Sequence, residues 1–165
     1  MIYVMGGAVD VAGNIHESAI GNSAAEWNLY VDPYAADVVV ASGAPITFVP
    51  LDATNHAPVT VKFYDRLASD HKTPAATFVF DLLTKNRSFL TSGGYYFWDP
   101  LSAAILTNEG LAEIEVRTLA VIVDEGPESG RTKPTSSGSE VRVAMSADGA
   151  AFEDLFLATL NGRSL

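Results

Sequence analysis

The sequence predicts an α/β fold. Short apolar runs typical of buried strands alternate along the chain with helix-start signals. In the last third, two segments that alternate apolar and charged residues flank a Gly/Pro/Ser-rich loop (126–139), which predicts an antiparallel strand pair. A length of 165 residues fits one domain over residues 1–165, long enough to bury a core.

The first predicted strand is the apolar run IYVM (2–5), which Gly6-Gly7 ends. The small and polar residues 8–25 then predict a long loop, the kind of segment that carries binding groups on a rigid scaffold. The second predicted strand lies in PITFVPLD (45–52), with a proline on each side of its apolar core. Both strands end in polar loops, where functional groups are expected.

Proline and cap signals predict the helices. Asp32-Pro33 and Asp99-Pro100 each look like an N-cap followed by proline at the first helical position. The predicted helices cover residues 33–42, 58–69, 74–87 and 100–108, and a last amphipathic helix is capped by Asp148. In the helix over 74–87, Phe78, Leu82 and Leu83 fall on one predicted apolar face.

Composition narrows the class of function. The 20 acidic residues outnumber the 10 basic ones, and the net charge of −10 argues against a phosphate-neutralising nucleic-acid surface. The absence of cysteine excludes disulfides and thiolate metal sites, and fits a reducing, cytoplasmic compartment. No apolar run approaches the roughly 18 residues that span a bilayer, and the first residues lack the basic start of a secretory signal.

Three polar groups stand at the ends of apolar elements: Asn14/Glu26/Asn28, LDATN (51–55) and WDP (98–100). In open α/β sheets such groups gather at the carboxyl ends of strands, so they could share one pocket. Each also has a purely structural interpretation. The aspartate of WDP is typical of an N-cap, LDATN and Asn14 of turns, and Glu26 and Asn28 of exposed polar positions.

Other active-site motifs are missing from the sequence. It contains no nucleophile elbow, phosphate-binding Walker loop or H-E-x-x-H helix. His16, His56 and His71 share no metal-ligand spacing and are interpreted as loop or surface residues. A bound metal would therefore be held by carboxylate and carbonyl oxygens, which favours Ca²⁺ or Mg²⁺.

Taken together, three blocks resemble the nucleoside hydrolase family: VMGGAVDVAGNIHESAIGNSAAEWNLYVDPYAADVVV, then ITFVPLDATNHAPVT, then YYFWDPLSAAIL. The resemblance implies the C-terminal half of a Rossmann-like fold with a mostly parallel sheet. It also implies cleavage of the N-glycosidic bond of ribonucleosides, which gives ribose and a free base. Residues implied to bind the ribose are Met5, Asn14, Glu26, Asn28 and Asp99.

The same resemblance implies a catalytic Ca²⁺. Asp99 and the backbone carbonyl of Thr54 match its ligands, and Asp99, Trp98 and Asn14 match catalytic positions. Trp98 stands where the inosine-uridine branch has histidine. Tryptophan at this position looks like the purine-leaning branch, in which the indole stacks on the departing base.

The sequence departs from the family at its aspartate cluster, D-T-D-x-G-x-D-D. That cluster supplies most Ca²⁺ ligands and the general base, and neither Asp10 nor FVFDLL (78–83) replaces it. Ca²⁺ takes six to eight oxygens, so we expect weak ion binding and little or no hydrolysis by this chain alone. We also expect an apolar sheet edge that favours a homo-oligomer or a complementary N-terminal chain.

Two functions therefore remain open. In the first, the chain is one half of a purine nucleoside hydrolase and becomes active when an N-terminal half completes it. In the second, it is a catalytically inactive module that binds ribose or a nucleoside, or serves in assembly.

Overall fold

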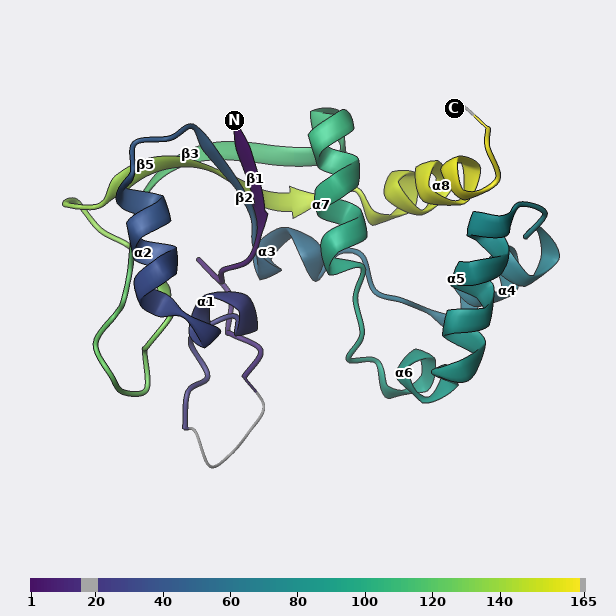
Figure 1. Cartoon of the computed structure of the whole chain (residues 1–165), viewed down its shortest axis with the longest axis horizontal. Coiled ribbons are helices and arrows are strands. Elements are labelled where there is room, and N and C mark those ends of the chain that lie inside the picture. The colour runs from purple at the N-terminus through teal and green to yellow at the C-terminus, as the bar shows by residue number, and fades with distance from the viewer. Residues whose placement is uncertain (16–20, 164–165) are drawn as a thin grey trace. The chain divides into compact units, whose positions relative to one another are not determined.

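The computed structural model describes residues 1–15 and 21–163. The chain groups into two compact units, shown in Figure 1. The first contains Met1–Thr54 and Ala112–Ala147, and the second contains Asn55–Leu111 and Asp148–Leu165. One domain over the whole chain stays a prediction. In the described part of the chain, no helix has the length and apolar character needed to cross a bilayer.

The first unit is built on a five-stranded sheet of order β1-β2-β5-β3-β4. Its strands are β1 (Ile2–Met5), β2 (Ile46–Val49), β3 (Ala112–Val121), β4 (Thr132–Pro134) and β5 (Ser139–Ala147). β2 pairs in parallel with β1 and β5, whereas β3 pairs antiparallel with β5 and β4. This confirms the α/β fold and the antiparallel pair. The predicted loop 126–139 is corrected, because β4 forms inside it by pairing with β3, the strand that precedes it in the chain.

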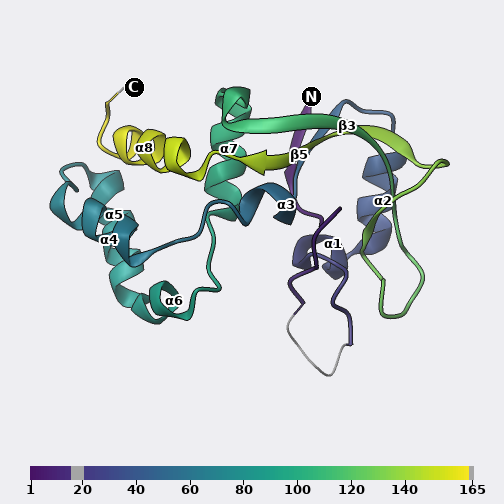
Figure 2. The same ribbon diagram turned by 180° about the vertical axis from the view of Figure 1, so that it is seen from behind.

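The core of the first unit lies where α2 (Pro33–Ala41) packs on β3 and β5 (Figures 1 and 2). Asp32 caps this helix as predicted, since its Oδ1 accepts from the Ala35 amide at 2.9 Å. β2 is buried along its whole length, in keeping with its place between two parallel neighbours. β1 lies at one edge of the sheet, and its Ile2 is 42% exposed.

The second unit contains only helices as regular elements among its described residues. They are α4 (Val61–Ser69), α5 (Pro74–Lys85), α6 (Arg87–Ser92), α7 (Trp98–Thr107), the 3-10 turn η1 (Glu109–Leu111) and α8 (Gly149–Leu160). α4 begins later than predicted, because Pro58 forms a β-bridge with Tyr96 and Thr60 becomes the N-cap. Asp148 caps α8 as predicted.

The apolar face predicted for α5 is confirmed only for Leu83, which is buried. It is wrong for Phe78, which is 68% exposed, and for Leu82, which is 49% exposed. Phe80, which lies off the predicted face, stacks on the Tyr64 ring of α4 at 5.2 Å between centroids. The packed face is set by the neighbouring helices, which the periodicity of α5 alone did not indicate.

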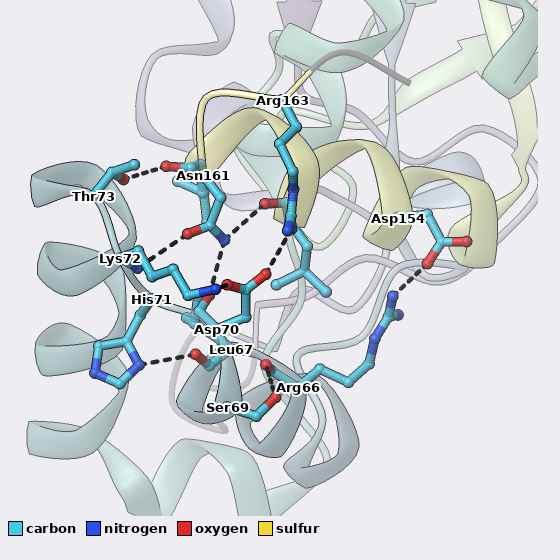
Figure 3. Close-up of polar contacts among 12 residues, drawn as sticks. Arg66, Leu67, Ser69, Asp70, His71, Lys72, Thr73, Asp154, Asn161 and Arg163 are labelled. Atoms are coloured by element: carbon cyan, nitrogen blue, oxygen red, sulfur yellow. Dashed lines mark hydrogen bonds and ion pairs between the residues drawn. The ribbon is translucent and has the colours of Figure 1, made fainter.

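Ion pairs and hydrogen bonds join the turn between α4 and α5 to the end of α8 (Figure 3). The Asp70 carboxylate lies 2.7 Å from the Arg163 guanidinium, and the Asn161 side chain donates to the Asp70 carbonyl at 2.8 Å. The hydrogen bond from Arg163, with a contribution from Lys72, lowers the pKa of Asp70 below its ordinary value of 3.8. The ionised form of Asp70 therefore favours the folded state.

This contact predicts a pH-dependent loss of stability. The pKa of Asp70 is lower in the folded chain, so its contribution is present above the unfolded pKa and disappears as the pH falls through the folded pKa. We expect Asp70→Asn to lower the urea midpoint at pH 6, and the difference from wild type to shrink below about pH 4. Asp81→Asn, at an exposed α5 position, is the matched control. A difference that stays constant with pH contradicts the role of Arg163.

Candidate functional site

Four residues singled out in the sequence meet at the carboxyl end of β1. Asn14 accepts at its Oδ1 from the Trp27 amide at 2.8 Å. The Asn28 side-chain amide lies 3.4 Å from the Met5 carbonyl and 3.3 Å from the Met5 sulfur. Glu26 accepts from the Asn28 amide at 3.0 Å. The first unit thus brings together Met5, Asn14, Glu26 and Asn28.

Glu26 is the N-cap of α1 (Trp27–Val31), and its side chain is buried, not exposed. It is 2% exposed, and besides the Asn28 amide it accepts from Gly7 at 3.1 Å and Leu29 at 3.4 Å. The interpretation of Glu26 as an exposed polar residue is therefore wrong. Its carboxylate joins the loop after β1 to the start of α1.

Asn14 and Asn28 retain free hydrogen-bonding groups. The Asn14 backbone donates to the Ala25 carbonyl at 3.1 Å, and a Cβ on the preceding Gly13 would lie 2.0 Å from that carbonyl oxygen. Among residues 1–15 and 21–163, no partner contacts the Asn14 side-chain NH₂ or the Asn28 side-chain oxygen. These groups can therefore donate to and accept from the hydroxyls of a sugar.

LDATN is not a polar turn. Its first four residues form the short helix α3 (Leu51–Thr54), which is buried throughout. Asp52 accepts from the amides of Val9 and Asp10, and the Thr54 hydroxyl is buried without a hydrogen-bond partner in the described chain. The sequence signal that could have found Asp52 is an acid shortly after the end of a buried strand. The Thr54 carbonyl remains a predicted metal ligand.

Asp99 does not cap its helix, contrary to the N-cap interpretation. α7 begins at Trp98, because the Leu101 amide bonds the Phe97 carbonyl at 3.0 Å and Pro100 is tolerated in the first turn. Phe97 takes the cap position with no side-chain hydrogen bond. The Asp99 carboxylate is exposed and has no partner among the residues that the structure describes. It is therefore available for a ligand.

Trp98 lines a cavity of about 190 Å³ in the second unit. Its ring stands edge-on to Tyr95 at 5.0 Å between centroids, and its indole N–H is buried with no acceptor in the described part of the chain. The cavity is walled mainly by apolar and aromatic side chains, with Asp99 at its margin. Such a wall suits a flat ring with a hydrogen-bond acceptor.

The residues present do not form a complete calcium site. Within residues 1–15 and 21–163, no three His, Cys, Asp or Glu side chains group as a metal centre would require. Thr54 belongs to the first unit and Asp99 to the second. Both oxygens of the nearby Asp52 already accept backbone amides. Two candidate oxygens fall short of the six to eight that Ca²⁺ takes. His16 lies outside the described residues.

Comparison with known proteins gives one consistent family. The model of the inosine-uridine preferring nucleoside hydrolase family matches residues 1–154. The inosine-uridine preferring nucleoside hydrolase of Bacillus anthracis has 30% identity and a TM-score of 0.82, over 96% of this chain and 50% of that one. The purine-preferring ribonucleoside hydrolase of Gardnerella vaginalis has 30% identity and a TM-score of 0.77, over 96% of this chain and 51% of that one.

One curated relative is named for pyrimidines and not for purines. The pyrimidine-specific ribonucleoside hydrolase RihA of Salmonella paratyphi B is 39% identical over 84 residues, which are 50% of this chain and 24% of the relative. The chain spans about half the length of the solved structures that it matches. The match covers 15% to 24% of the length of curated relatives. The matched part is the C-terminal part of the family.

Proposed function

This chain belongs to the inosine-uridine preferring nucleoside hydrolase family, and we propose that it takes part in hydrolysing the N-glycosidic bond of ribonucleosides. The observation that carries the proposal is the meeting of Met5, Asn14, Glu26 and Asn28 at the carboxyl end of β1. The products are ribose and a free base. The proposed role of this half of the fold is to hold the ribose.

The free groups of the site suit a sugar. The Asn14 NH₂ donates to one hydroxyl, and the Asn28 side-chain oxygen accepts from another. Glu26 contributes mainly by fixing the backbone around them, because its oxygens already serve three amides. A site that hydrogen-bonds sugar hydroxyls disfavours a deoxy sugar, whose missing hydroxyl leaves a polar group unpaired.

For the base, we propose stacking on Trp98 with a preference for purines. Support comes from the indole and Tyr95 on the wall of the 190 Å³ cavity. Breaking the glycosidic bond builds positive charge on the sugar ring, as in glycoside hydrolysis. A base held against an aromatic wall leaves in a fixed orientation. The exposed Asp99 carboxylate would bind a sugar hydroxyl.

The residues present do not complete a calcium site. The predicted ligands, Asp99 and the Thr54 carbonyl, belong to different units, and a Ca²⁺ ion would need most of its six to eight oxygens from elsewhere. We propose that turnover requires the N-terminal half of a family member, supplied as a complementary chain or within an oligomer. The edge strand β1 is where additional strands would pair.

A second function is a catalytically inactive module that binds ribose or a nucleoside. The observation in its favour is that the described residues contain no group of three His, Cys, Asp or Glu side chains that could hold a metal ion. In that case the sugar-binding residues remain and the hydrolysis is absent. The two functions differ in turnover, whereas both require ribose binding.

Both proposed functions require ribose binding, and a comparison of a ribonucleoside with a deoxyribonucleoside tests it. By calorimetric titration we expect inosine to bind about tenfold more tightly than 2′-deoxyinosine, since one hydrogen bond to the sugar is lost. Asn14→Ala and Asn28→Ala should reduce the affinity for inosine and narrow this difference. Asn108→Ala, at the end of α7 in the second unit, should change neither. Equal binding of both nucleosides by the wild type contradicts the proposed ribose site.

A further inference from the structure

The segment after β1 is held by an unusual set of contacts. The backbone amides of residues 7 to 10 donate, in order, to Glu26, Thr132, Asp52 and again Asp52, at 3.1, 2.9, 2.9 and 2.8 Å. This segment contains no helix or strand. Its amides are therefore satisfied by side chains instead of by a regular backbone ladder.

The three acceptors come from separate places in the first unit. Glu26 caps α1, Asp52 lies in α3, and Thr132 begins β4. They are 2%, 4% and 1% exposed, respectively. Buried acceptors of this kind fix the backbone strongly, because an amide that lost its partner there would stay unpaired away from water.

Asp52 and Thr132 each make two contacts. The two Asp52 oxygens accept separately from Val9 and Asp10. The Thr132 hydroxyl accepts from the Ala8 amide and donates to the Ala8 carbonyl at 2.8 Å. Gly7 has a φ of 89°, and a Cβ there would lie 3.0 Å from the Thr132 hydroxyl. Only a residue without a side chain fits this close approach comfortably.

Residues 7–10, called the held segment below, lie between two residues of the proposed ribose site. Met5 ends β1 immediately before it, and Asn14 follows it by a few residues. We propose that Asp52 and Thr132 are positioning residues, which fix residues 7–10 so that Met5 and Asn14 keep their places. The inference rests on the proposed function for the ribose, but the held segment itself is independent of any ligand.

The hydroxyl of Thr132 allows a clean test. Thr132→Val keeps the shape and removes the hydroxyl, whereas Thr132→Ser keeps the hydroxyl. We expect Thr132→Val to speed hydrogen exchange of the Ala8 amide about tenfold. Asp52→Asn should likewise speed exchange of the Val9 or the Asp10 amide, since the asparagine keeps one acceptor oxygen. Thr132→Ser should retain the protection. Asp148→Asn, an aspartate that likewise accepts two amides at the start of α8, should leave all three unchanged.

The NMR signals of Met5 and Asn14 report whether these two residues keep their positions. In NMR spectra without ligand, Thr132→Val and Asp52→Asn should shift the Asn14 side-chain amide and Met5 methyl signals, and Thr132→Ser should restore them. Variants that speed exchange while these signals stay unchanged overturn the inference and leave a purely structural role. Titration of the wild-type chain with inosine then distinguishes the positioning role from the proposed function. If the variants shift these signals but the wild type binds no nucleoside, the positioning role is supported and the proposed function is contradicted.

Discussion

Replacing Glu26 with alanine is expected to lower the free energy of unfolding by about 3 to 5 kcal/mol. The side chain is 2% exposed and accepts from the amides of Gly7, Asn28 and Leu29. Without the carboxylate, three donors lose their acceptor, two of them in buried hydrogen bonds and one in a partly buried one, at about 1–3 kcal/mol for each buried donor before relaxation and water entry. The measurement is urea unfolding at neutral pH.

One control variant and one conservative variant accompany Glu26→Ala. Glu125→Ala removes an exposed carboxylate in the same unit and should change the unfolding free energy by less than about 0.5 kcal/mol. Glu26→Gln keeps the shape but turns one acceptor oxygen into a donor, so an intermediate loss is expected. If Glu26→Ala proves as stable as the wild type, the capping role assigned to Glu26 is wrong.

Local chemistry predicted much of the fold. Asp32 and Asp148 cap helices as expected, because an acid before a helix can accept its free amides without help from distant residues. The antiparallel pair of β3 and β5 was likewise visible in the alternation of apolar and charged residues. These features depend on neighbours in sequence, so the sequence alone indicates them.

Errors arose where partners lie far apart in the sequence. Thr132 was placed in a loop, yet it begins β4 and holds the Ala8 backbone 124 positions away. Phe80 was left off the packed face of α5, although Tyr64 and His71 stack on it. Asp99 matched the cap pattern, but the helix starts two residues earlier than predicted, at Trp98. The outcomes for Thr132 and Phe80 depend on tertiary contacts that local patterns do not report.

For the candidate site, the sequence identified the proposed sugar-binding residues but not the contacts that fix the backbone around them. Met5, Asn14 and Asn28 were found through the family resemblance, and the structure brings them together at the end of β1. Asp52 lies in LDATN, which the sequence singles out, but its contacts to the Val9 and Asp10 amides were not predicted, and no motif marks Thr132. Their contacts are to backbone amides, and backbone amides carry no sequence signal.

Hydrolysis of inosine in the presence of Ca²⁺ is expected to need more than this chain. The described residues contain no group of three His, Cys, Asp or Glu side chains that could hold a metal ion, and the sequence lacks the aspartate motif that the family resemblance links to the general base. General-base catalysis typically contributes about 10²–10⁴-fold. We expect the chain assayed alone to fall below a whole family enzyme by at least that factor.

The most direct test combines this chain with the N-terminal half of a family member. The chain is mixed with the N-terminal half of a family member that carries the D-T-D-x-G-x-D-D aspartates, and inosine hydrolysis is measured for each part and for the mixture. Turnover is expected in the mixture alone, abolished by Asp99→Ala and retained by Asp81→Ala. Appreciable turnover by the chain alone, or turnover in the mixture that survives Asp99→Ala, would contradict this expectation.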